Sequence, residues 1–223
     1  MKNNYPAQKG IKIMFSFFKK KEWPKLSLDE IRKRSRILVI DDSDFAYQTL
    51  FENEGYTIDK WDDVDDLPKL EKGYYDIILL DIQGVGKEHS KEQGLGILKH
   101  LHEVCPTQII IAYSNADFSL EYQDFFKMAD AVLAKADDYV QFKRTVDKLL
   151  RERFSLGFYL KRVEGLVSPY ANDVEKVRKL TEKAILNQNT AKIESYLDQQ
   201  IDNKDIITIT LQVIQVAIGI TAI

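Results

Sequence analysis

A chain of 223 residues that is 44% hydrophobic and 30% charged is too apolar to be disordered, and it is long enough for one or two folded domains. Its net charge of −3 is uneven: residues 1–35 carry +7 (ten basic, three acidic), residues 36–150 carry −11 (12 and 23) and residues 151–223 carry +1 (10 and 9). The acidic middle and balanced end argue against nucleic-acid binding, and the single cysteine, Cys105, excludes an internal disulfide, as is typical of cytoplasmic proteins.

The first 35 residues are expected to form a basic N-terminal extension, a flexible lead-in to the first domain. Within it, the segment IKIMFSFFKKKEW (11–23) places apolar residues before lysines, the reverse of a cleavable signal peptide. A basic and aromatic anchor on a membrane surface is the alternative interpretation. Met14 is a second possible start of the chain.

Short apolar runs, rich in β-branched residues, predict five buried strands separated by helices. The strands are expected at 36–40, 56–61, 75–80, 108–113 and 131–134, and the helices at 43–55, within 62–73, and at 91–105, 119–130 and 137–154. Ser43 is a candidate N-cap of the first helix and Gly55 marks its end. This alternation predicts an α/β fold, a doubly wound sheet of parallel strands with right-handed crossovers.

Residues 154–223 predict a second, small and mainly helical domain, with helical stretches at about 171–187 and 190–201. The last 18 residues, 206–223, contain no charge. On a helix, Thr208, Gln212, Gln215 and Gly219 would form one narrow stripe. Residues 207–212 also alternate as a strand would. A core or dimerisation element, a membrane tail and a strand added to a partner's sheet therefore remain open.

Polar side chains stand where four of the expected strands end. Asp41 and Asp42 follow the first strand, and Asp81, Ser114 and Lys135 follow the third, fourth and fifth. Because the carboxyl ends of parallel strands share one edge of a sheet, these side chains should converge. Three carboxylates would repel one another, and a divalent cation such as Mg²⁺, which prefers oxygen ligands, would relieve the repulsion.

The same set suits phosphoryl chemistry. The ammonium of Lys135 and a bound Mg²⁺ would neutralise phosphoryl oxygens, the hydroxyl of Ser114 would donate to one of them, and a carboxylate would attack phosphorus. No single residue of the set is specific, because an Asp after a strand is often only a turn residue. The specificity comes from polar residues at four strand ends, in order along the chain.

This pattern resembles the receiver domain of two-component response regulators over residues 36–153. The resemblance is carried by VIDDSD (39–44), LLDIQG (79–84), IAYSNAD (111–117) and LAKADD (133–138). It implies a five-stranded, flavodoxin-like sheet of order 2-1-3-4-5. It also implies roles for residues: Asp81 as phosphoacceptor, Asp41, Asp42, Asp81 and the carbonyl of Gln83 as Mg²⁺ ligands, Ser114 as the switch hydroxyl and Lys135 as the lysine that contacts the phosphate.

The sequence departs from the family in three places. The loop after Asp81, residues 82–94, is longer and lacks proline, Ala136 stands where the family usually has proline, and Val132 stands where it has a switch aromatic. Because a cis bond without proline is costly, the bond after Lys135 is expected to be trans.

The resemblance implies a cytoplasmic phosphorelay protein rather than an enzyme. Its expected partners are a sensor histidine kinase or other phosphodonor, and a protein that contacts residues 154–223; a homodimer is possible, and no nucleic acid is expected. Contact of the C-terminal tail with a membrane is the less favoured reading. A degenerate receiver that acts as a phosphorylation-independent scaffold or adaptor is the alternative function.

Overall fold

The computed structural model describes residues 22–115 and 123–222, and the structural statements below concern these residues. Five strands form one sheet in the order β2-β1-β3-β4-β5, and every neighbouring pair is parallel. The strands are β1 Arg36–Ile40, β2 Thr57–Trp61, β3 Ile77–Leu80, β4 Ile109–Ser114 and β5 Ala131–Ala134. The predicted α/β class and strand order are confirmed.

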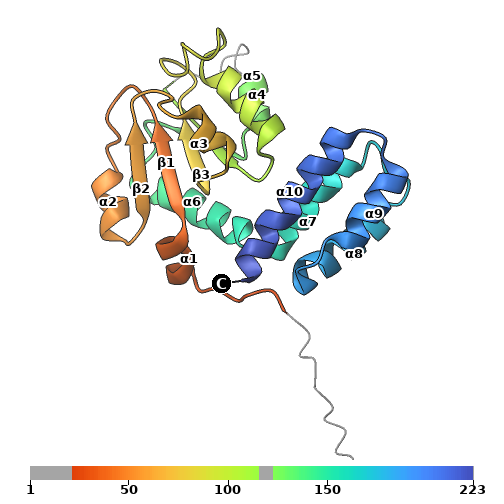
Figure 1. Ribbon diagram of the computed structural model, residues 1–223. Coiled ribbons are helices and arrows are strands. Elements are labelled where there is room, and N and C mark those ends of the chain that lie inside the picture. The colour runs from red at the N-terminus through yellow and green to blue at the C-terminus, as the bar shows by residue number, and fades with distance from the viewer. Residues whose placement is uncertain (1–21, 116–122, 223) are drawn as a thin grey trace, which may run out of the picture.

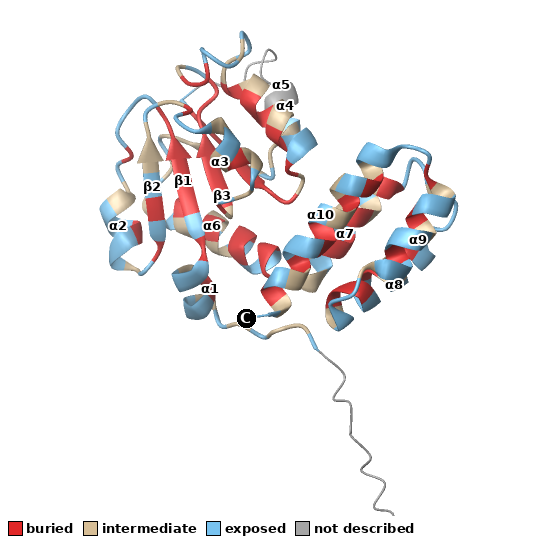
Figure 2. Ribbon diagram, in the orientation of Figure 1, coloured by how far each residue is buried: buried red, intermediate tan, exposed pale blue. Residues whose placement is uncertain are grey.

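Helices cover both faces of the sheet (Figure 1). Those on one face are α1 Leu28–Arg34, α2 Gln48–Asn53 and α6 Tyr139–Arg153, and those on the other are α3 Leu67–Glu71, α4 Gly94–Val104 and α5 Gln123–Met128. Along β1, Ile37 and Val39 join the first core, and Leu38 and Ile40 join the second. The central strands are apolar without interruption because both of their faces are buried (Figure 2).

The rest of the chain forms four helices that pack together beside the sheet (Figure 1). They are α7 Leu156–Val167, α8 Val174–Asn187, α9 Ala191–Gln200 and α10 Lys204–Thr221. The expectation of a mainly helical C-terminal region is confirmed. The hydrophobic core of the α6 face continues into this bundle as one cluster, through Phe154, Tyr159 and Leu160. The junction at residues 153 and 154 is therefore a turn between two helices, not an exposed linker.

The uncharged C-terminus is a helix, so the interpretation of residues 206–223 as a strand is wrong. Its buried positions, Ile207, Thr210, Val213, Ile214, Ala217 and Ile220, recur at helical spacing and face the bundle. The polar stripe predicted for a helix lies on the exposed side. Packing against α7, α8 and α9 resolves an ambiguity that the sequence pattern left open.

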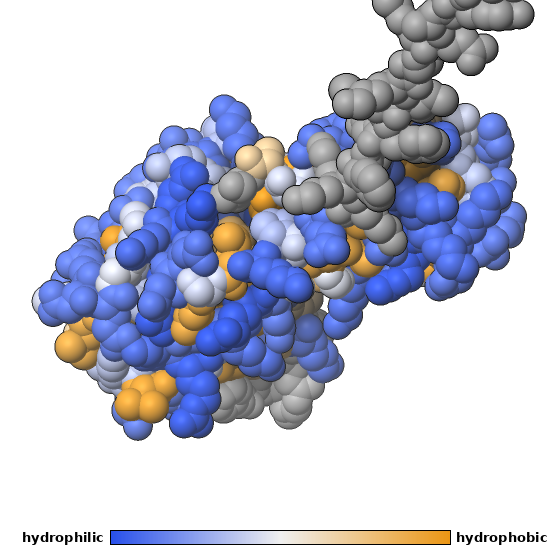
Figure 3. Space-filling view, turned by 90° about the horizontal axis from the view of Figure 1, so that it is seen from below, coloured by the Kyte–Doolittle hydropathy of each residue, from blue (hydrophilic) through white to orange (hydrophobic). Residues whose placement is uncertain are grey.

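Among the described residues, α10 is the one helix whose length and apolar composition would suffice to cross a membrane, and 33% of it is buried in the bundle. Seen from below, the described surface of the molecule is mostly hydrophilic, with hydrophobic residues in separate patches (Figure 3).

Two local expectations need correction. Residues 28–34, placed in a flexible lead-in, form α1, which Ser27 and Glu30 start with a reciprocal capping box. The predicted cap Ser43 does not start α2, which begins at Gln48; the Ser43 N–H instead donates to Asp41 Oδ1 at 2.8 Å. Gly55, with φ +86°, ends α2 as predicted. Most of the 11–23 segment, including Met14, lies outside the described residues.

The segment before β1 is fixed to α6 by a partly buried polar network. Arg32 donates two hydrogen bonds to Asp147, at 3.2 Å and 2.7 Å, and the hydroxyl of Tyr56 also donates to Asp147. Further back, the indole N–H of Trp23 donates to the carbonyl of Phe154 at 2.8 Å. The N-terminal segment therefore braces the α6–α7 turn.

Replacement of Asp147 by Ala should lower the free energy of unfolding by about 2 kcal/mol, because Arg32 and Tyr56 both lose a partly buried acceptor. Urea denaturation measures the change. Lys148→Ala is the matched control on the same helix, because Lys148 lies 3.9 Å from Glu152 in an exposed pair, and its loss should cost at most about 0.5 kcal/mol. Equal effects of the two substitutions would show that the Asp147 network does not stabilise the fold.

Candidate functional site

The predicted site residues lie at the carboxyl edge of the sheet, where β1 and β3 are neighbours and the crossovers change direction. The Asp81 N–H donates to the carbonyl of Ile40 at 3.0 Å, which places Asp81 beside Asp41. Ser114 is the last residue of β4, is buried and pairs with Ala134 of β5; the Lys135 N–H donates to its carbonyl at 3.1 Å. In doubly wound sheets this switch point is where ligands bind.

The ammonium group of Lys135 lies between two buried carboxylates. Its Nζ is 2.7 Å from Asp81 Oδ2 and 2.8 Å from each carboxylate oxygen of Asp41. Burial alone would lower the pKa of Lys135, but the hydrogen bonds to Asp41 and Asp81 outweigh it and raise the pKa. Lys135 is therefore a fixed positive charge at the point where the ends of β1, β3 and β5 meet.

The three acidic side chains fit a divalent cation. Asp41, Asp42 and Asp81 each offer one carboxylate oxygen, and these atoms lie within 4.8 Å of one another. Asp41 Oδ2 is buried and, although Lys135 is near, makes no hydrogen bond within the described residues. Asp42 is exposed, which leaves one side open to water. An oxygen-only set with room for waters is what Mg²⁺ requires.

Gln83, the fourth predicted ligand, lies in the turn after Asp81. Its N–H donates to Asp81 Oδ1 at 3.3 Å, so it orients the carboxylate. Coordination of a cation by its carbonyl stays a prediction.

The long loop of residues 82–94 is fastened to the site. Gly84 has φ +87°, and a Cβ there would lie 2.3 Å from Asp42 Oδ2, so glycine lets the loop approach the acidic pair. The Gly84 N–H donates to Gln93 Oε1 at 2.9 Å. Gln93 itself has φ 54°, a strained value for a residue other than glycine. Gly84 therefore brings the 82–94 loop into close contact with the Asp42 side chain.

Several partners of the site were not predicted. Asp63, in the loop after β2, accepts hydrogen bonds from the N–H groups of Val64 and Gly86 and ties its own loop to the 82–94 loop. Lys60 donates to the carbonyl of Asp41 at 2.6 Å. The ring of Tyr113 lies 5.3 Å from Lys135 Nζ, and burial raises the pKa of Tyr113 to about 12. Of these residues, only Lys60 could have been suspected from the sequence, because it is a charged residue near the end of the predicted strand 56–61.

Among solved structures, the chain is similar to a CheY-like response regulator receiver domain protein from Methanospirillum hungatei, with 25% identity over 53% of this chain and 95% of that one and a TM-score of 0.45. It is also similar to the response regulator protein TrrA from Thermotoga maritima, solved in complex with Mg²⁺ and BeF (26% identity, 52% and 98% coverage, TM-score 0.41). A two-component response regulator from Clostridium difficile has 23% identity, 53% and 97% coverage and a TM-score of 0.44. No protein-family model and no curated protein matches the chain.

The sheet order 2-1-3-4-5, with helices on both faces and an acidic site at the β1–β3 switch point, defines the class as flavodoxin-like α/β. Within that class, the strand order and the flanking helices match the receiver fold that the sequence predicted. The assignment covers about half of the chain, and α7–α10 lie outside it.

Replacement of Asp42 by Ala should weaken Mg²⁺ binding at least about tenfold, or about 1.4 kcal/mol, because the cation loses its one exposed carboxylate ligand. Isothermal titration with MgCl₂ measures the affinity. Asp65→Ala removes another exposed acid from the loop after β2 and should leave the affinity unchanged. Unchanged affinity in Asp42→Ala would remove Asp42 from the ligand set.

Replacement of Lys135 by Met should destabilise the fold in a pH-dependent way. The folded-state pKa of Lys135 is raised, so its contribution to stability is complete below the ordinary value of 10.5 and is lost as pH rises through the raised value. The difference in free energy of unfolding between wild type and variant, measured with EDTA, should therefore be constant from pH 7 to 9 and shrink above 10.5. A difference that does not shrink would show that the Lys135 charge is not its source.

Proposed function

We propose that this chain is a phosphorylation-controlled signalling protein of the response regulator type. Asp81 accepts a phosphoryl group from a sensor histidine kinase or another phosphodonor, in the cytoplasm and with Mg²⁺ bound. The chain is the acceptor in this reaction, not an enzyme that acts on a separate substrate. Phosphorylation alters the contacts of the helical C-terminal region with a protein partner.

The observation that carries the proposal is the position of Lys135 between Asp41 and Asp81. A carboxylate oxygen of Asp81 attacks phosphorus, a new P–O bond forms, and the bond from phosphorus to the donor's nitrogen or oxygen breaks with its electron pair. The product is a mixed anhydride on Asp81. Lys135, 2.7 Å from Asp81, is placed to pair with a phosphoryl oxygen as negative charge builds there.

The other residues of the site would bind the cation, orient Asp81 and contact the phosphoryl group. Asp41, Asp42 and Asp81 would hold Mg²⁺, which when bound neutralises phosphoryl oxygens. The Gln83 N–H, at 3.3 Å, holds the Asp81 carboxylate in one orientation. Ser114, whose carbonyl accepts from the Lys135 N–H at 3.1 Å, would offer its hydroxyl to the phosphoryl group. Exposed Asp42 keeps one side of the site open to a donor.

The connection from the site to the bundle supports the signalling role. Lys135 is followed within three residues by Asp138, whose side chain caps α6, and Asp137 accepts a hydrogen bond from the Ala134 N–H at 2.8 Å. α6 then runs to Arg153 and is followed directly by α7. A shift of Lys135 toward a phosphoryl group would therefore act on the start of the helix whose far end carries the bundle.

The bundle is proposed as a protein-interaction surface. Residues 151–223 carry 10 basic and 9 acidic residues, which do not make the basic patch that nucleic-acid binding needs. Exposed Val216 lies on α10 and exposed Tyr170 lies in the turn after α7, and they offer small apolar contacts for a partner or a second copy of the chain.

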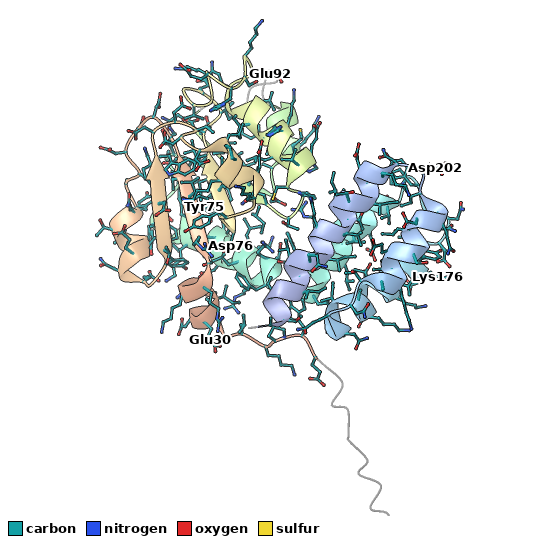
Figure 4. All side chains as sticks on the ribbon, in the orientation of Figure 1. Glu30, Tyr75, Asp76, Glu92, Lys176 and Asp202 are labelled. Atoms are coloured by element: carbon teal, nitrogen blue, oxygen red, sulfur yellow. The ribbon has the colours of Figure 1, made fainter. Side chains whose placement is uncertain are left out.

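Incubation with acetyl phosphate should add one phosphoryl group to the wild-type protein in the presence of Mg²⁺ and none in EDTA. Intact-mass measurement gives the stoichiometry. Asp81→Asn should abolish the gain, because an amide cannot form the anhydride. Asp202→Asn, in the exposed turn before α10 (Figure 4), is the control and should be phosphorylated normally.

Retained uptake in Asp81→Asn would show that another residue is the acceptor. No uptake by folded wild-type protein, from acetyl phosphate or from a set of histidine kinases, would overturn the proposal in favour of a scaffold that does not depend on phosphorylation.

A further inference from the structure

A pocket of about 630 Å³ lies between the sheet and the bundle, at the edge of the sheet opposite Asp81. Asp76, which immediately precedes β3, marks this edge in Figure 4, whereas Asp81 follows the same strand. One wall comes from the turns before β3 and β4 and the other from α10. Lining residues include Gly73, Cys105, Thr107, Arg153, Leu211 and Gln212. The volume lies within the range typical of small-molecule sites.

The guanidinium of Arg153 is buried in this wall beside the rings of Tyr159 and Phe158, 5.2 Å and 5.6 Å from its Cζ atom, but it has few hydrogen-bond acceptors. The residue is only 5% exposed, and its Nε and Nη1 atoms form no hydrogen bond with any described residue. Its nearest carboxylate oxygen, Asp76 Oδ1, is 3.8 Å from Nη2, too far for a hydrogen bond. Burial lowers the pKa of Arg153 and raises that of Asp76, so each charge is poorly compensated by the other. Buried charges normally have hydrogen-bonded partners, and the guanidinium of Arg153 has fewer acceptors than it has N–H groups.

The other residues that line the pocket indicate what kind of molecule would supply a hydrogen-bond acceptor to Arg153. Leu211, Val213 and Val216 of α10 and Val104 before β4 give an apolar surface. The charged groups besides Arg153 are Lys72, at the exposed rim, and Glu71, whose carboxylate is paired with the His100 ring nitrogen at 2.7 Å. An apolar lining with a buried guanidinium is complementary to an organic acid, and a guanidinium matches a carboxylate in shape as well as in charge.

We propose that this pocket binds a small organic carboxylate with an apolar body, its carboxylate beside Arg153 and its body against α10. The site is separate from the phosphoacceptor and does not depend on phosphorylation of Asp81. Because its two walls belong to the sheet and to the bundle, the occupied pocket holds the bundle against the sheet. The molecule would thus receive a chemical input at one edge of the sheet and a phosphoryl group at the other.

The single cysteine of the chain provides a direct readout, because Cys105 lines this pocket and is buried. Octanoate is the probe and octanol the control, with a chain of the same length and no charge. The rate of Cys105 alkylation by iodoacetamide, which is neutral, is measured by intact mass with each added. At octanoate concentrations ten times its Kd, alkylation should slow about 11-fold, because only the unoccupied fraction reacts. Octanol should protect at least about tenfold less well at equal concentration, since it offers Arg153 no charge.

Three variants locate the effect. Val216→Trp fills the pocket from α10 and should abolish protection by octanoate. Ile209→Trp places the same side chain on the same helix outside the pocket and should leave protection intact. Arg153→Met keeps the length of the side chain and removes its charge, so octanoate should lose its advantage over octanol.

Equal protection by octanoate and octanol in the wild type, or unchanged protection in Val216→Trp, would overturn the proposal. If Arg153→Met does not fold, the Val216→Trp and Ile209→Trp pair still decides the location, and the comparison of octanoate with octanol still decides the charge. Asp81→Asn should bind octanoate as the wild type does, so failure of the phosphorylation proposal and failure of this one are distinguishable.

Discussion

The contact on which this architecture depends is the ammonium of Lys135 between Asp41 and Asp81. Parallel strands bring their carboxyl ends to one edge, and here two of those ends place buried carboxylates side by side. Without a countercharge they would repel each other and their burial would be costly. Lys135, at 2.7 Å and 2.8 Å, makes the convergence stable. The same positive charge then makes the edge attractive to a phosphoryl group, so stability and chemistry share one interaction.

The second constraint is the absence of a linker after α6. Phe154 ends α6, Ser155 caps α7, and one hydrophobic cluster extends from the sheet into the bundle. Trp23 adds a hydrogen bond to the Phe154 carbonyl from the N-terminal side. A bundle held in this way differs from a domain on a flexible tether, because its position is set by the direction of α6.

The sequence predicted the sheet well because its strands are short apolar runs with sharp ends; β5 was predicted at residues 131–134 and is observed there. The site was predictable for the same reason, since each polar residue stands where a run stops. α7 was not predicted: its segment, LGFYLKRVEGLV, contains aromatic residues and two glycines, which are weak helix formers, and tertiary packing overrides this preference. The buried state of Arg153 was also beyond prediction, because a basic residue in the last turn of an amphipathic helix is normally solvated. Only the docking of α7 and α10 buries it.

The direct succession of α6 and α7 has a mechanical consequence. α6 has 15 residues and spans about 22 Å, and α10, in the bundle beyond it, has 18 residues and spans about 27 Å. If α6 and the bundle move as one rigid body, they form a lever whose short arm starts at the site. A tilt of about 5° in such an arm moves a point 27 Å away by about 2 Å, enough to open or close a van der Waals contact. A displacement around Lys135 by about the length of a hydrogen bond would thus change the van der Waals contacts that the far end of the bundle makes with a partner.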